Sequence, residues 1–176
     1  MKKILMLSAI LMIATSTNLI AQTSKGNWLL GGSASFSSQK NGDYKFTSFT
    51  IAPAAGYFVI DDLGIGAALA YSNFKEDNSD AVNSFVFAPF VRYYFLPLGK
   101  GAKLFANGTF GFGSAKAGGD SESLTTWQIA AGPAIFLNQS IALEIALGYG
   151  STKYKNDDDP TNAFGINVGF QIHFKK

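Results

Sequence analysis

The stretch Ser48–Ser72, SFTIAPAAGYFVIDDLGIGAALAYS, contains two alternating runs that meet at Asp61-Asp62. Because successive side chains of a β-strand point to opposite faces, a period of two predicts two strands joined by a short turn. On one face the side chains are mostly large and apolar, and on the other most are glycine, alanine, serine or threonine. The first face holds Phe49, Ile51, Pro53, Ala55, Tyr57 and Val59, followed by Leu63, Ile65, Ala67, Leu69 and Tyr71.

The same hairpin pattern recurs twice more along the chain. A second copy runs from Ser84 to Leu96, turns through 97–102 and returns to Phe112, and a third runs from Trp127 through Asn138-Gln139 to Tyr149. Single alternating runs precede and follow the three copies, at 28–37 and 164–174. The sequence therefore predicts an all-β chain of eight antiparallel strands of about ten residues, in up-and-down order.

The N-terminal residues have the layout of a secretory signal peptide. Lys2 and Lys3 precede the apolar run 4–13, and a polar stretch then leads to Leu19-Ile20-Ala21. We expect cleavage after Ala21, because the apolar run is too short for a membrane-spanning helix. Residues 1–21 are thus predicted to be the signal peptide and residues 22–176 a single β-barrel domain.

Charge and cysteine content exclude several classes of protein. Removing Lys2 and Lys3 from the 14 basic residues leaves 12, against 12 acidic residues, so the exported chain has no basic excess that would indicate a nucleic-acid partner. The chain has no cysteine, which excludes disulfides, thiolate metal sites and a lipid-anchored N-terminus. We expect no cofactor and no metal.

The positions of the charges favour a membrane barrel over a soluble one. Only Arg92 and Glu144 fall well inside a predicted strand, and both lie on the face of small residues. A soluble barrel carries its charges outside and its large apolar residues inside, which is the opposite arrangement. A charge facing lipid costs roughly 2 to 4 kcal/mol at mid-bilayer, so the large apolar face must contact outer-membrane lipids.

Connection lengths predict the orientation. Polar loops are expected at 39–44, 73–83, 114–123 and 152–162, and short turns at 60–62, 97–102 and 138–140. Outer-membrane barrels have longer external loops and short periplasmic turns, so both termini are expected in the periplasm. Pro53, Pro89 and Pro133 recur inside predicted strands, where the missing N–H predicts either a local bulge or a position whose donor needs no partner.

The repeated segments resemble a known family. APAAGYF (52–58), APFVRYYF (88–95), AGPAIF (131–136) and GFQIHF (169–174) are similar to the small eight-stranded outer-membrane β-barrels of the OmpX and OmpA-barrel type found in Bacteroidetes. The resemblance covers nearly the whole exported chain and implies a location in the outer membrane of a Gram-negative bacterium. It also implies assembly by the outer-membrane insertion machinery, but it implies no reaction.

Few residues indicate chemistry. The only histidine, His173, is predicted to face inward near the periplasmic end, and no activated serine accompanies it. The acidic runs 76–80 and 157–159 lack the spacing of a calcium loop, and the glycines of 108–113 precede no helix that could bind phosphate. We instead predict an Arg92–Glu144 ion pair within a polar network in the lumen, whose members are Arg92, Glu144, Gln171, His173, Asn107, Gln128 and Asn167.

Three functions remain open from the sequence. The first is a structural or surface-interaction barrel whose external loops bind an unidentified ligand; the second is a narrow porin-like channel, and the third an outer-membrane lipid-modifying enzyme. An eight-stranded barrel is just wide enough for side chains to fill its interior, which disfavours passage. No catalytic set is visible, so we expect a monomeric barrel that is not an enzyme.

Overall fold

The computed structural model describes residues 22–41, 44–76 and 79–175, so the expected signal peptide lies outside the described residues. The described residues form eight strands and contain no helix long and apolar enough to cross a membrane. The strands are β1 (Trp28–Asn41), β2 (Tyr44–Ile60), β3 (Leu63–Glu76), β4 (Val82–Leu98), β5 (Ala102–Ala117), β6 (Asp120–Phe136), β7 (Ile141–Tyr154) and β8 (Thr161–Phe174).

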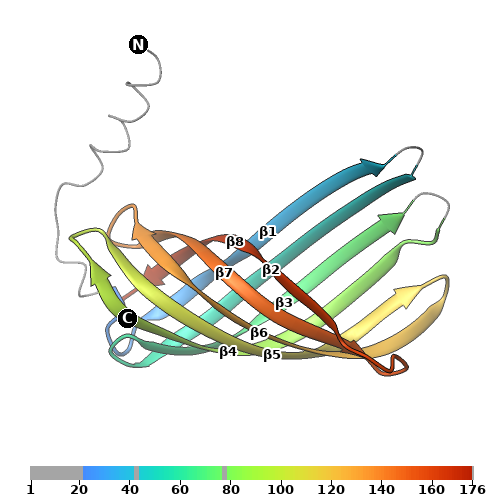
Figure 1. Ribbon diagram of the computed structural model, residues 1–176. Coiled ribbons are helices and arrows are strands. Elements are labelled where there is room, and N and C mark those ends of the chain that lie inside the picture. The colour runs from blue at the N-terminus through green and yellow to red at the C-terminus, as the bar shows by residue number, and fades with distance from the viewer. Residues whose placement is uncertain (1–21, 42–43, 77–78, 176) are drawn as a thin grey trace, which may run out of the picture.

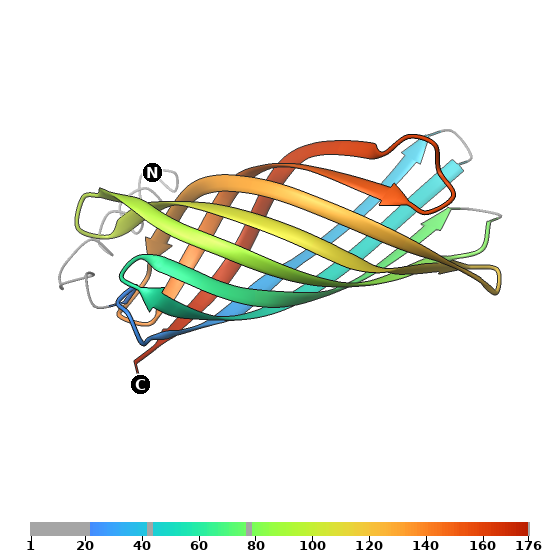
Figure 2. The ribbon, with the colours of Figure 1, turned by 90° about the horizontal axis from the view of Figure 1, so that it is seen from below.

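Each strand pairs antiparallel with its neighbours in chain order, and β8 pairs with β1 to close a barrel. Figures 1 and 2 show the long, strongly tilted strands and the C-terminus at one end. The predicted all-β, eight-stranded, up-and-down fold is confirmed. We call the end with the β2–β3, β4–β5 and β6–β7 connections the turn end, and the opposite end the hairpin end.

The register gives the tilt of the strands. Starting at Trp28 and stepping from one paired residue to the next leads around the barrel to Phe164 of β8, and the β1–β8 register would place Phe164 opposite Ser38. This stagger of ten residues, from 28 to 38, corresponds to strands tilted by roughly 40°. About ten residues of such a strand cross a bilayer. The strands are 14 to 17 residues long, so they extend beyond the membrane.

The polar loops expected at the hairpin end are largely strand, and the expected strand length of about ten residues is wrong. Where a loop was expected at 114–123, β5 and β6 stay paired up to Ala117 and Asp120, and only Gly118-Gly119 connects them. Both glycines have positive φ, as a type I′ hairpin turn requires. The hydrogen bonds between β5 and β6 join backbone groups. They therefore continue through polar residues, where apolar and polar side chains no longer alternate. For the same reason β3 continues to Glu76 and β7 to Tyr154, inside the loops expected at 73–83 and 152–162, whereas residues 42–43 and 77–78 lie outside the described chain.

The outer surface is the apolar face that the sequence predicts. Leu69, Phe87, Ile129 and Ile145, from four different strands, are all exposed on it. Inside, small residues make room for a few large rings: a Cβ built on Gly66 would lie 2.5 Å from the Phe90 ring. Because each inward glycine or alanine gives space to a neighbour's side chain, the lumen can hold large groups on only some strands.

Two aromatic pairs lie on the outer surface at different heights along the barrel axis. Trp28 packs edge-on against Tyr57 with ring centroids 5.2 Å apart, and Trp127 packs against Tyr149 at 5.7 Å. The register path climbs roughly 3 Å per strand at this tilt, which places Tyr149 nearly 20 Å above Trp28 along the barrel axis. This separation is close to the roughly 25 Å height of the apolar band of outer-membrane barrels.

The prolines do not produce the expected bulges. The β2–β3 pairing is absent between Ile51 and Ala54 but resumes in the same register, and the ladders next to Pro89 and Pro133 behave alike. On its other side Pro53 stays in register opposite Gly32 of β1. Each proline therefore interrupts one ladder locally, because it lacks a donor, without adding a residue. The bulges lie instead near the turn end, at 58/60 and 94/96.

Candidate functional site in the barrel lumen

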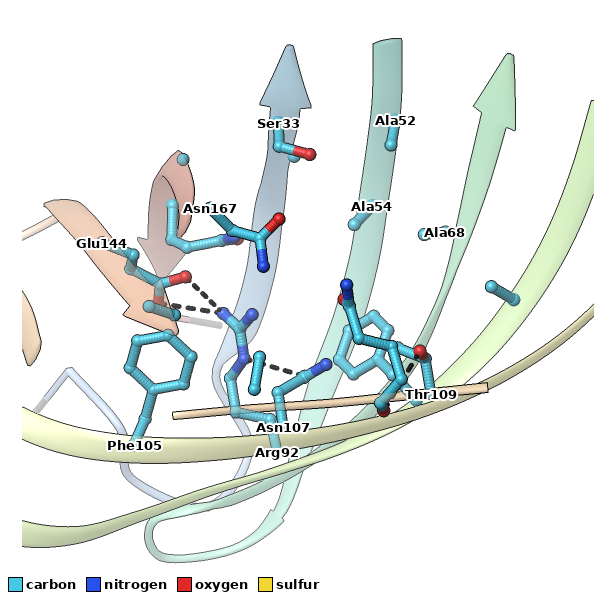
Figure 3. Close-up of a pocket in the computed structure, with 18 of the residues that line it drawn as sticks. Ser33, Ala52, Ala54, Ala68, Arg92, Phe105, Asn107, Thr109, Glu144 and Asn167 are labelled. Atoms are coloured by element: carbon cyan, nitrogen blue, oxygen red, sulfur yellow. Dashed lines mark hydrogen bonds and ion pairs between the residues drawn. The ribbon is translucent and has the colours of Figure 1, made fainter. Parts of the chain in front are cut away.

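An ion pair crosses the lumen between β4 and β7. Nη1 of Arg92 donates to both carboxylate oxygens of Glu144, at 2.9 and 3.0 Å, as the strand counting predicts. Asn107 accepts a hydrogen bond from Arg92 Nε at 3.2 Å, and the Tyr94 hydroxyl donates to Glu144 Oε1 at 3.1 Å. Figure 3 shows the guanidinium between Glu144 and Asn107. Both charges are buried, and each is paired by the other.

The guanidinium also lies against aromatic rings. Its Cζ is 4.8 Å from the centroid of Phe105 and 5.7 Å from that of Phe90. Cation–π contact adds attraction where water is excluded. Phe90 and Phe105 are therefore part of the site, although their sequence pattern marks them only as inward apolar residues.

Below the ion pair, toward the turn end, the lumen is filled by aromatic rings. His173 packs against Phe58, Tyr94 and Phe136, with ring centroids 5.9, 6.2 and 5.4 Å away. Neither His173 ring nitrogen has a hydrogen-bond partner among the described residues. The expectation that His173 belongs to the polar network is wrong, because its side chain points into the aromatic layer rather than toward Glu144.

A second ion pair lies at the turn end and was not predicted. Lys103 Nζ is 2.6 Å from Asp62 Oδ1 and 2.8 Å from the Thr23 hydroxyl, and Thr23 also hydrogen-bonds to Asp62. Asp62 has a φ of 64°, a left-handed conformation that aspartate tolerates better than most residues. The sequence places these three residues in separate turns and segments, so no local pattern indicates that they meet.

The residues before β1 cover the turn end. Gln22, Thr23 and Asn27 are buried, and the Gln22 side chain donates to the carbonyl of Asn138 across the barrel mouth at 3.0 Å. The backbone N–H of Gly26 donates to the carbonyl of Phe58 at 2.9 Å. The first described residues are therefore held across this mouth and close it together with the aromatic layer.

Above the ion pair, toward the hairpin end, lies a cavity of about 230 Å³. Alanines of β2, β3 and β4 line one wall, and Asn107, Thr109, Gln128 and Asn167 contribute polar groups (Figure 3). A Cβ on Gly148 would lie 2.6 Å from the Asn167 amide nitrogen and 3.4 Å from that of Gln128. The two predicted network residues, Gln128 and Asn167, thus line the cavity next to a glycine of β7 and are not bonded to the ion pair.

Gln171, the last predicted network residue, lines the same cavity. It is 4% exposed, and its Oε1 has no hydrogen-bond partner among the described residues. A buried acceptor without a donor is unfavourable by about 1 to 3 kcal/mol. The lumen therefore combines a fully paired charge, an aromatic floor and a partly polar cavity. Within residues 22–41, 44–76 and 79–175, no three acidic or histidine side chains are grouped as metal ligands.

The comparisons with known proteins agree with this architecture. The family model described as outer membrane protein beta-barrel domain matches residues 7–173. The chain belongs to this family. Its location in the outer membrane of a Gram-negative bacterium follows from the family. A search of curated proteins finds no match.

Solved structures share the fold at low sequence identity. Neisserial surface protein A is similar with a TM-score of 0.63 and 15% identity, covering 85% of this chain and 98% of that one. The N-terminal β-barrel domain of Pseudomonas aeruginosa OprF gives 0.54 and 14%, covering 85% and 98%. OprG from the same organism gives 0.54 and 10%, covering 89% and 100%. At these identities the likeness shows the fold.

Proposed function

We propose that this chain is a monomeric outer-membrane barrel that acts at the cell surface through its hairpin end and does not conduct solutes. The observation that carries the proposal is the closed turn end. Phe58, Tyr94 and Phe136 are almost fully buried around His173, and the ion pair of Arg92 and Glu144 lies directly above them. An ion crossing the lumen would have to displace both layers.

The hairpin end is the part we expect outside the cell. Strand residues 120–126 continue past Trp127 toward this end, whereas only Phe58–Ile60 separate Tyr57 from the β2–β3 turn. Outer-membrane barrels project further on the external side, which supports periplasmic termini. Outer-membrane lipids contact the apolar belt, and the insertion machinery assembles the barrel.

The lipid-modifying role receives no support from the position of His173. A catalytic histidine must reach an accessible substrate, yet this ring is 3% exposed and surrounded by aromatic side chains. We therefore propose that the protein is not an enzyme. Unchanged lipid A and phospholipid profiles in a strain lacking the protein are the expected result, and a missing modified lipid would contradict it.

Planar-bilayer conductance tests the closed lumen. The purified protein is expected to give no discrete openings at either polarity. The double variant Phe58→Ala/Phe136→Ala removes two rings that pack on His173 but leaves the ion pair in place, so it is also expected to give no openings. Adding Arg92→Ala/Glu144→Ala removes the second layer as well, and this variant is expected to pass ions. Regular conductance steps from the parent protein would contradict the proposal and support the narrow channel.

A further inference from the structure

The barrel closes over only part of its β1–β8 seam. β1 pairs with β8 from Trp28 to Ser33, opposite Phe174 to Gly169, whereas it pairs with β2 along its whole length. Beyond these residues the two ribbons separate, β1 running toward β2 and β8 toward β7 (Figure 1). We call the unpaired parts of the two strands, residues 34–41 and 161–168, the open seam.

The backbone of β1 has a special conformation next to the last β1–β8 pair. Gly32 has a φ of 146°, and a Cβ there would lie 2.3 Å from the carbonyl oxygen of Ala52. Only glycine adopts this conformation without strain. The last β1–β8 pair, at Ser33, thus comes one residue after a backbone conformation that requires glycine.

The lower part of the open seam lies within the membrane. Ser33 is five residues above Trp28, which is roughly 12 Å along the axis for strands tilted by about 40° and so about half the height of the apolar band. Phe36 and Ile166, which belong to the two strands of the open seam, are each 69% exposed. Unpaired backbone groups in hydrocarbon each cost several kcal/mol and persist only where they line a cavity or meet a partner.

The lumen cavity reaches the point where the pairing stops. Its lining includes Gly32 and Ser33 of β1 together with Val168 and Gly169 of β8. Val168, which is 50% exposed, adjoins the last pair, so the cavity extends to the point where pairing between β1 and β8 ends. From this point toward the hairpin end, no β1–β8 pairing of the described residues separates the cavity from the membrane.

We propose that the open seam admits a single-chain amphiphile from the surrounding leaflet, and that its acyl chain occupies the lumen cavity. The cavity exceeds the roughly 150 Å³ apolar cavity that holds one benzene molecule, but it is too small for a lipid with two long chains. The inference does not depend on the surface role proposed above.

The two walls fit the two parts of such a molecule. Ala52, Ala54 and Ala68 present methyl groups on one side, and Asn167 presents its amide on the other, two residues from the last β8 pair (Figure 3). The chain lies along the alanine wall, and the polar head meets the amide groups and the unpaired backbone near the seam. Gln171, with its unpartnered Oε1, lies deeper on the same strand and offers an acceptor to a hydroxyl or a protonated carboxyl.

Photo-labelling tests whether the amphiphile enters through the open seam, because a disulfide can close the seam. The parent and its variants are reconstituted in phosphatidylcholine vesicles with an octanoic acid analogue that carries a diazirine at its chain end, and labelled peptides are mapped by mass spectrometry. Because the chain has no native cysteine, Phe36→Cys/Ile166→Cys introduces a single pair, opposite each other in the continued β1–β8 register. Oxidation is expected to lower labelling of the alanine wall at least tenfold, and reduction to restore it.

The matched control is Leu30→Cys/Ile172→Cys, which joins two outward residues that are already paired and should leave labelling unchanged. Ala68→Phe, which fills the cavity, should lower lumen labelling at least tenfold, whereas Ala67→Phe on the lipid face of the same strand should not. If the cysteines do not form a disulfide, this pair of variants still tests whether the label lies in the cavity.

Labelling confined to the lipid face of the parent, or lumen labelling that persists with the seam joined or the cavity filled, would overturn the proposal. Efficient dimerisation of Phe36→Cys alone would also overturn it, by showing a second copy at the seam.

Discussion

Removing either member of the Arg92–Glu144 pair should destabilise the barrel far more than a surface change. Arg92→Met deletes both hydrogen bonds to Glu144 and the bond to Asn107, and it leaves a buried carboxylate whose remaining hydrogen-bonding partners, Tyr94 and Gln171, carry no positive charge. Breaking a buried pair in this way costs about 3 to 5 kcal/mol. Glu144→Gln keeps one carbonyl acceptor, so its expected cost is lower, about 2 to 4 kcal/mol.

The double variant Arg92→Met/Glu144→Gln leaves no unpaired charge in the lumen. Its loss in free energy of unfolding should be about 2 kcal/mol smaller than the sum of the two single losses. The measurement is equilibrium urea unfolding in phosphatidylcholine vesicles, followed by the fluorescence of Trp28 and Trp127. The control cycle combines Arg92→Met with Glu122→Gln, whose carboxylate contacts the backbone of Asn156 near the hairpin end, and it should be additive. Additivity within about 0.5 kcal/mol in the lumen cycle would refute the coupling.

Three further predictions follow from the same structure. Ile145→Arg places a charge on the lipid face and should cost about 2 to 4 kcal/mol in the same unfolding assay, whereas Ser121→Arg near the hairpin end should change stability by less than about 0.5 kcal/mol; equal effects would contradict the face assignment. A membrane-impermeant maleimide should label Asp158→Cys but not Asp61→Cys on intact cells, and equal labelling would reverse or abolish the proposed orientation. Lys103→Met removes the cation that joins Asp62 and Thr23, so hydrogen exchange of residues 22–27 should accelerate while the β4–β5 ladder stays protected; unchanged exchange would show that the lysine does not hold this segment.

The fold could be predicted because its signal is local and repeated. Alternation from Phe49 to Tyr71 identifies two strands and their faces without reference to any other part of the chain. Once strand order is up-and-down, counting from the turns places Arg92 and Glu144 at similar depth. The ion pair could therefore be predicted from two one-dimensional facts, the inward face and the distance from a turn.

The length of the strands could not be read in the same way. At 114–123 the polar side chains carry no apolar alternation, yet the backbone ladder continues to Gly118-Gly119. Alternation reports burial against lipid, whereas hydrogen bonding between strands needs only the backbone. The sequence therefore indicates where a strand leaves the membrane better than where it ends.

The side-chain partners of residues near the ends of the barrel depended on the tertiary structure. The meeting of Lys103 with Asp62 and Thr23, and the packing of His173 among rings rather than in the polar network, follow from the stagger of ten residues around the barrel. That stagger decides which residues of distant strands share a level, and it is a property of the closed sheet as a whole.

The sequence by itself determined the strand number, the lipid-facing side and the charges that must be buried. These depend on the two-residue alternation of apolar and small side chains and on which of the two faces carries a charged residue. Only the tertiary structure decided that β1 leaves β8 after Ser33 and that a cavity reaches this end of the pairing. β1 and β8 are the first and last strands, and no local sequence pattern indicates how many of their residues pair. Their closure depends on the registers of all the other strands.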